Sequence, residues 1–147
     1  VGYRGIEDVM RMLVQGFTDG CAANGISFDG KRDVWTANSP EEIQRDKIKA
    51  AYGQGVRIFV GVNDVAGSLL VQQLNGLGYK IPQNVLVTGC DNSPICDVTI
   101  PKLTTVDLSI RTLAMRAGRN LHPGIVNGVG SEQSILVRGE LLIGETT

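Results

Sequence analysis

The stretch RIFVGVNDVAGSLL, residues 57–70, decides the fold class of this chain. Residues 58–62 form a continuous apolar run, which is typical of a strand covered on both faces of a sheet. Asn63 or Asp64 can then cap a helix. A second buried strand is predicted at residues 85–89, Val-Leu-Val-Thr-Gly. Strands that alternate with helices of about 12 or more residues predict a parallel sheet.

The flanking segments supply the remaining elements. Apolar residues at three-and-four spacing predict a helix over residues 6–24 that Asn24 and Gly25 close. Ser39, Pro40 and Glu42 are arranged as the start of another helix. This helix should end near Gly53 or Gly55. We expect two more helices, one over residues 64–77 and one from Ser109 to a stop at Pro123–Gly124. Further strands are expected within residues 103–108 and 134–143. The predicted fold class is therefore α/β, with a parallel sheet and helices on both faces.

Composition excludes several classes of function. The chain has 147 residues, a formal net charge of −1 and 42% hydrophobic residues. A protein that binds nucleic acid by itself usually carries a basic patch, and this sequence has none. Three scattered cysteines and one histidine favour neither a disulfide framework nor a metal site, so we expect a reduced, cytoplasmic protein without metal or cofactor. No apolar run approaches the length of about 20 residues that spans a membrane.

Small polar side chains follow the two predicted buried strands. Asn63 follows the first and Asp91 the second, and ligands of open parallel sheets bind beyond the carboxyl ends of the strands. An amide and a carboxylate together can hold sugar hydroxyls. Trp35 is a candidate for stacking on a sugar ring or a base. Each residue has a structural alternative: a helix cap for Asn63, an Asx-turn for Asp91 and core packing for Trp35.

Cys90, in the segment LVTGCDNSP of residues 86–94, raises the alternative of a cysteine enzyme. A nucleophilic thiolate needs a base, usually histidine, and His122 is 32 residues away near a predicted helix end. Nucleophile-elbow and phosphate-loop motifs are absent from the sequence. We therefore expect Cys90 to be a packing residue and the chain not to be an enzyme.

Four motifs in order resemble the sensor domain of the LacI/GalR family of bacterial transcription repressors. They are VNDVAG at 62–67, LGYKIPQNV at 77–85, VTGCDN at 87–92 and IPKLTTV at 100–106. Weaker matches, Gln15-Gly16-Phe17 and residues 137–147, extend the resemblance over nearly the whole chain.

The resemblance implies a two-lobed fold like that of periplasmic sugar-binding proteins, with the effector between the lobes. Asn63 and Asp91 match family positions that hydrogen-bond the effector, and Trp35 resembles a family tryptophan that packs on the sugar ring. The family's effector arginine is replaced by Leu13, so Arg4 and Arg11 become candidates in its place. Cys90 stands where the family has tyrosine or phenylalanine, which suggests a larger pocket.

The resemblance also implies how the chain is divided. Residues 1–105 correspond to the second lobe, 106–124 to a segment that returns to the first lobe, and 125–147 to a closing strand region. The DNA-binding headpiece and most of the first lobe are absent. The expected function is effector binding by a homodimeric regulator that controls DNA binding through that headpiece, with Ser68 and Thr99 at the dimer interface. The alternative is the solute-binding protein of a sugar transporter.

Overall fold

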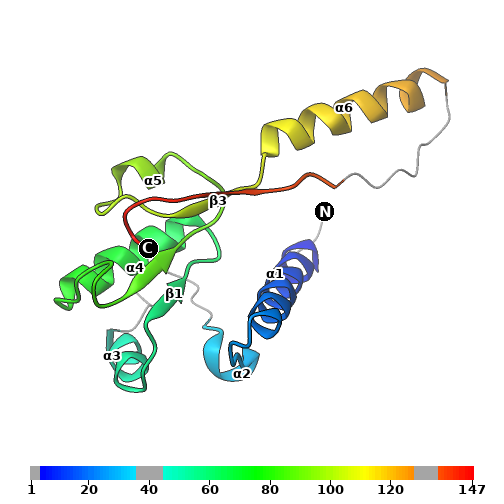
Figure 1. The fold of residues 1–147 in the computed structure, drawn as a ribbon. Helices are drawn as coiled ribbons and strands as arrows, with labels where there is room; N and C mark the ends of the chain where they lie inside the picture. The colour runs from blue at the N-terminus through cyan, green and yellow to red at the C-terminus, as the bar shows by residue number, and fades with distance from the viewer. Residues whose placement is uncertain (1–3, 36–44, 128–135) are drawn as a thin grey trace. The chain divides into compact units, whose positions relative to one another are not determined.

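The computed structural model describes residues 4–35, 45–127 and 136–147, shown in Figure 1. The chain forms two compact units, Val1–Glu42 and Ile43–Thr147, and each is described by itself. The predicted helix start at Ser39, Pro40 and Glu42 lies outside the described residues. Within the described residues, no helix is both long enough and apolar enough to cross a membrane.

The first unit contains helix α1 (Arg4–Ala23) and the short helix α2 (Gly30–Asp33). The predicted helix over residues 6–24 is therefore confirmed. Gly25, at φ +68°, adopts the left-handed conformation that ends many helices. The rings of Phe17 and Phe28 meet edge to face with their centroids 5.1 Å apart, so the segment after α1 folds back against the helix.

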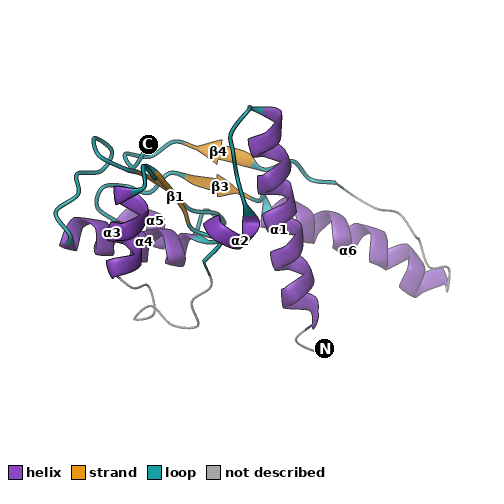
Figure 2. Ribbon diagram, turned by 90° about the horizontal axis from the view of Figure 1, so that it is seen from below, coloured by secondary structure: helices purple, strands orange, loops and turns teal. Residues whose placement is uncertain are grey.

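The second unit contains the sheet and the remaining helices, as Figure 2 shows. Its elements in chain order are α3 (Arg45–Gly53), β1 (Ile58–Val60), α4 (Asp64–Gly76), β2 (Leu86–Thr88), α5 (Ile95–Val98), β3 (Thr105–Asp107), α6 (Ile110–Asn127) and β4 (Glu140–Leu142).

The predicted parallel pairing is found between β1 and β2, which form one two-stranded sheet, and β3 and β4 form a second one. β1 and β2 pair in parallel with Phe59 opposite Val87, and a parallel bridge joins Thr88 to Thr104 just before β3. β3 then pairs with β4 in antiparallel register. Helix α4 packs against both β1 and β2. The α/β fold class is thereby confirmed.

The core lies between the sheet and its helices. The side chains that are almost completely buried include Ile48, Val71, Leu74, Val85, Val87 and Leu103. The helical spacing also predicts an inward-facing Val65, but this side chain is 53% exposed and Val71 is buried instead. Ile58 and Val60 are exposed while Phe59 between them is buried, so among the described residues only one face of β1 is covered, and the prediction of cover on both faces is wrong for this strand.

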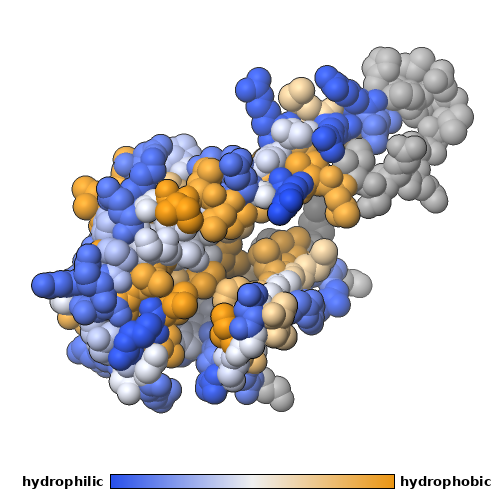
Figure 3. All heavy atoms as spheres, in the orientation of Figure 1, coloured by the Kyte–Doolittle hydropathy of each residue, from blue (hydrophilic) through white to orange (hydrophobic). Residues whose placement is uncertain are grey.

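Helix α6 differs from its expected length. It extends to Asn127, so the predicted stop at Pro123–Gly124 is wrong. Every described side chain from residue 110 to 119 is exposed, including Ile110 and Leu113. In Figure 3 hydrophilic side chains stand out from α6 beside apolar ones.

Candidate functional site

The carboxyl ends of β1 and β2 form one edge of the sheet, because the two strands are neighbours and parallel. Asn63 follows β1 and Asp91 follows β2. A hydrogen bond from the backbone N–H of Ser93 to Asp64 Oδ2, 2.7 Å long, ties the two strand-end segments together. The structure thus places Asn63 and Asp91 on the same edge of the sheet.

Asn63 is the N-cap of α4. It has extended backbone geometry, and its Oδ1 accepts a hydrogen bond of 2.9 Å from the backbone N–H of Ala66. Because only an oxygen can accept from that N–H, the orientation of the amide is determined. The cap interpretation is therefore correct. It leaves the Nδ2 N–H groups of Asn63 to donate to a ligand.

Asp91 is half-buried, and none of the described residues donates a hydrogen bond to its carboxylate. Burial raises the pKa of Asp91 above its usual value, and the nearby charge of Asp64 raises it further. Asp91 and Asn92 have positive φ angles of 114° and 54°. Such conformations cost about 1–3 kcal/mol each outside glycine and often occur at ligand sites.

Asp64 is a functional candidate that the sequence suggested only as a second possible cap. Its side chain is 1% exposed and accepts hydrogen bonds from the Ser93 N–H and the Thr105 hydroxyl. Burial by itself would raise the pKa of Asp64, but the hydrogen bonds that it accepts outweigh burial and lower it. A side chain at Gly89 would overlap the Asp64 carboxylate, so glycine is required there.

The cysteines near this edge are not activated as nucleophiles. Burial, followed by the charge of Asp91, raises the pKa of the Cys90 thiol. Burial and a hydrogen bond to Asp64 raise the pKa of Cys96 to about 11. A catalytic cysteine needs the opposite shift, because the thiolate is the nucleophile.

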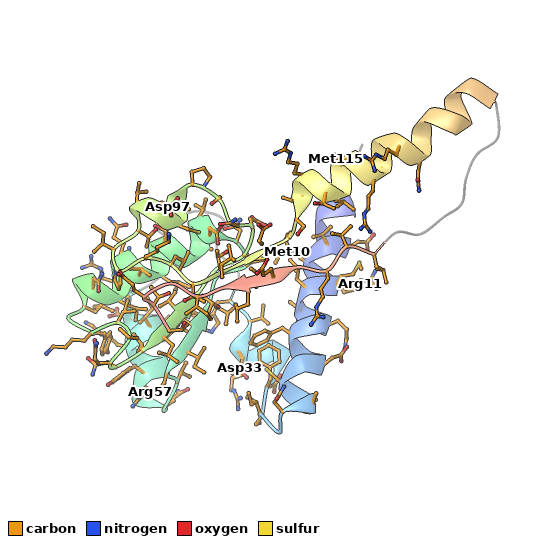
Figure 4. All side chains as sticks on the ribbon, turned by 45° about the horizontal axis from the view of Figure 1, so that its top comes forward. Met10, Arg11, Asp33, Arg57, Asp97 and Met115 are labelled. Atoms are coloured by element: carbon orange, nitrogen blue, oxygen red, sulfur yellow. The ribbon has the colours of Figure 1, made fainter. Side chains whose placement is uncertain are left out.

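The other predicted effector contacts belong to the first unit. Trp35 is half-buried. Arg11 is exposed and forms an ion pair of 2.7 Å with Asp8, one turn away on α1 (Figure 4). Arg4 is the first residue of α1, and its side chain is outside the described part. Since the units are described separately, the structure does not bring these three residues together with Asn63 and Asp91, and their role in effector binding stays a prediction.

The predicted interface residues Ser68 and Thr99 do lie together. Their hydroxyl oxygens are 3.0 Å apart, and Thr99 Oγ1 also donates to the carbonyl of Ile95. Thr99 is buried in its own chain, whereas its neighbours Val98 and Ile100 are 73% and 83% exposed. These residues line a shallow groove of about 360 Å³ beside α4. The apolar side chains that a partner could contact are Val98 and Ile100, which lie on either side of the predicted Thr99.

Within the described part of the chain, no group of three histidine, cysteine or acidic residues is arranged to hold a metal ion.

Comparison with known proteins identifies the fold family. Residues 2–147 match the model of the periplasmic binding protein-like domain. The regulator NtdR of the NTD biosynthesis operon in Bacillus subtilis (strain 168) is 30% identical over 102 residues, which are 69% of this chain and 31% of NtdR.

Solved structures of transcriptional regulators have a similar fold. A LacI-type transcription regulator from Bifidobacterium animalis subsp. lactis is 25% identical, with a TM-score of 0.71 over 90% of this chain and 48% of that one. The transcriptional regulator CelR in complex with cellobiose has a TM-score of 0.77 at 20% identity, over 91% of this chain and 41% of that one. The chain thus spans less than half the length of each of these relatives. It belongs to the family of periplasmic binding protein-like domains, in the form that LacI-type transcriptional regulators carry.

Proposed function

We propose that this chain is the effector-binding and dimerisation part of a LacI-type transcriptional regulator, and that it binds a small sugar-like molecule at the edge formed by Asn63 and Asp91. The observation that carries the proposal is the half-buried Asp91 carboxylate, to which none of the described residues donates a hydrogen bond. A half-buried carboxylate has lost part of its hydration, and a ligand with hydroxyl donors would replace that hydration on binding.

The geometry of the edge favours a polyhydroxyl ligand. Asn63 offers two N–H donors from its Nδ2, since its oxygen already accepts from Ala66, and an ionised Asp91 can only accept. A hydroxyl group both donates and accepts, so hydroxyls of one sugar ring can satisfy both residues. Trp35, Arg4 and Arg11 are the proposed contacts from the first unit, where Trp35 would cover the apolar face of the ring.

Regulation would follow from closure of two lobes around the effector, which changes the geometry of a dimer and hence its affinity for an operator. In this proposal residues 1–105 belong to the second lobe, 106–124 return to the first, and 125–147 include the closing strand. DNA binding would require a headpiece outside this chain, and the regulator would act in the cytoplasm without catalysing a reaction. The relatives named above are regulators, which favours this role over that of a transporter's solute-binding protein.

The experiment that tests effector binding uses the natural protein that contains these residues. A thermal-shift screen with cellobiose, monosaccharides and nucleosides should identify a ligand that raises the unfolding temperature, because a ligand of the folded state stabilises it by mass action. The candidate should also change the affinity of the protein for operator DNA. Stabilisation by none of these compounds, or a ligand without effect on DNA binding, would contradict the proposal.

The proposed dimer contact is the exposed pair Val98 and Ile100. Replacement of Ile100 by aspartate should shift a dimer to monomer in sedimentation velocity, because a charge in an apolar interface loses its hydration. Ile26→Asp, at an exposed apolar residue of the first unit, is the matched control and should leave the dimer intact. Equal sedimentation of both variants and the unmodified protein would exclude this contact.

A further inference from the structure

Three elements of the second unit meet at the buried side chain of Asp64. Asp64 begins α4, Ser93 lies in the loop after β2, and Thr105 begins β3. Asp64 accepts hydrogen bonds from the backbone of Ser93 and from the hydroxyl of Thr105, which are 29 and 41 residues away in the sequence. It is the only carboxylate among the described residues that is almost fully buried.

The Thr105 hydroxyl extends this arrangement. It donates a hydrogen bond to Asp64, and its oxygen accepts a hydrogen bond of 3.3 Å from the backbone N–H of Asn92. The N–H of Asp91 donates to the carbonyl of Val106, the next residue of β3, over 2.9 Å. Each of the three consecutive N–H groups at 91–93 therefore has a defined acceptor.

These hydrogen bonds hold a segment whose positive φ angles are uncommon for residues other than glycine. The positive φ angles of Asp91 and Asn92 persist only where the surrounding structure determines them. Two of the three acceptors, Asp64 and the Thr105 hydroxyl, belong to one hydrogen-bonded pair, and β3 supplies the third. Asp64 is the first residue of α4, directly after the cap Asn63, and its carboxylate is bonded to Ser93. The same carboxylate therefore also fixes the distance between the start of α4 and the segment of Asp91.

We propose that Asp64 is a positioning residue of the effector site: without contacting the effector, it holds residues 91–93, of which Asp91 and Asn92 have positive φ angles, in the conformation that presents Asp91, and it joins this segment to β3. The consequence for effector affinity rests on the function proposed above, whereas the positioning itself does not. β3 leads directly into α6, so the same hydrogen bonds connect the effector site with the segment that returns to the first lobe.

The test measures amide hydrogen exchange in the ligand-free 147-residue chain. Thr105→Val removes the hydroxyl with little change of shape, and Thr105→Ser retains it as the matched control. Asp64→Asn removes the charge at the centre, and Asp97→Asn, at an exposed carboxylate, is its control. Thr105→Val and Asp64→Asn should each lower the protection of the amides at 91–93 by roughly tenfold, while the β2 amide of Val87 changes by less than about threefold.

The controls should exchange like the unmodified chain. Unchanged protection at 91–93 would overturn the proposal. An equal loss of protection at Val87 would also overturn it, because Asp64 would then contribute only to global stability.

A second measurement separates this inference from the proposed function. Calorimetric titration with cellobiose should show weaker binding in Thr105→Val than in Thr105→Ser. If the unmodified protein does not bind cellobiose, the choice of ligand fails, and the exchange data still decide whether Asp64 positions the segment.

Discussion

The carboxylate of Asp64, the first residue of α4, accepts the backbone N–H of Ser93 at 2.7 Å, two residues beyond Asp91. A negative charge at this place is favourable for the helix, because the N-terminus of a helix carries partial positive charge. The same charge is unfavourable for Asp91, whose pKa it helps to raise. One buried group therefore stabilises the sheet edge and places an electrostatic cost on the proposed effector contact.

Asp91→Asn should weaken effector binding roughly tenfold or more, because a hydrogen bond to a charged group contributes about 1.5–3 kcal/mol. The free energy of unfolding at pH 7 should stay equal or rise slightly, since the raised pKa of Asp91 means that its charge destabilises the folded state. Calorimetric titration and urea unfolding of the natural protein measure the two effects. Full affinity in Asp91→Asn would remove Asp91 from the site.

Cys90→Ser should instead mainly lower the free energy of unfolding, with little change in effector affinity, in the same two measurements.

Asp64 should make the fold sensitive to acid. Its pKa is lowered in the folded state, so its charge contributes stability that is present above the pKa of the unfolded chain, about 3.9, and is lost as the pH falls through the lower folded value. Urea unfolding between pH 5 and pH 2 should therefore show a steeper loss of stability in the unmodified chain than in Asp64→Asn, whose absolute stability is lower. Asp91, with its raised pKa, has the opposite slope, and this slope is larger in the unmodified chain because the Asp64 charge is one cause of the raised pKa, so it offsets part of the difference. Equal slopes would contradict the assignment.

Cys96 should resist thiol reagents in the folded chain. It is 3% exposed, and with a pKa of about 11 only about one thiol in a thousand is ionised at pH 8. The half-buried Cys90 should react first with a disulfide reagent, and all three cysteines should react after unfolding in guanidinium. Mass spectrometry of the modified peptides identifies the order. Rapid modification of Cys96 under native conditions would mean that α5 opens readily.

Helix α6 should exchange its amide hydrogens faster than α4. All described side chains of α6 between residues 110 and 119 are exposed, whereas α4 buries Leu70, Val71 and Leu74. A helix without a packed face has little besides its own hydrogen bonds to stabilise it. Hydrogen exchange detected by mass spectrometry on the 147-residue chain measures the amide protection of both helices. Protection of α6 equal to that of α4 would show that its apolar residues pack against a partner, such as a second copy of the chain.

Local sequence patterns determined the longer elements of this protein and their order, but not the short helices α2 and α5. Apolar spacing predicts α1 and α4, the apolar runs predict β1 and β2, and Asn63 is a cap because its short side chain can reach an N–H three residues on. The placement of Asn63 and Asp91 on one edge follows as well, since parallel strands end on the same side. Each of these features depends on interactions between residues that are close in sequence or on the strand order of a parallel sheet.

Contacts between distant segments were decided only by the tertiary structure. The sequence leaves Asp64 as an alternative cap, because its partners Ser93 and Thr105 become neighbours only when the sheet assembles. Thr99 is buried while Val98 and Ile100 on either side are exposed, which depends on how the loop packs on α4. Burial and electrostatic coupling depend on distances across the fold, and periodicity along the chain contains no information about those distances.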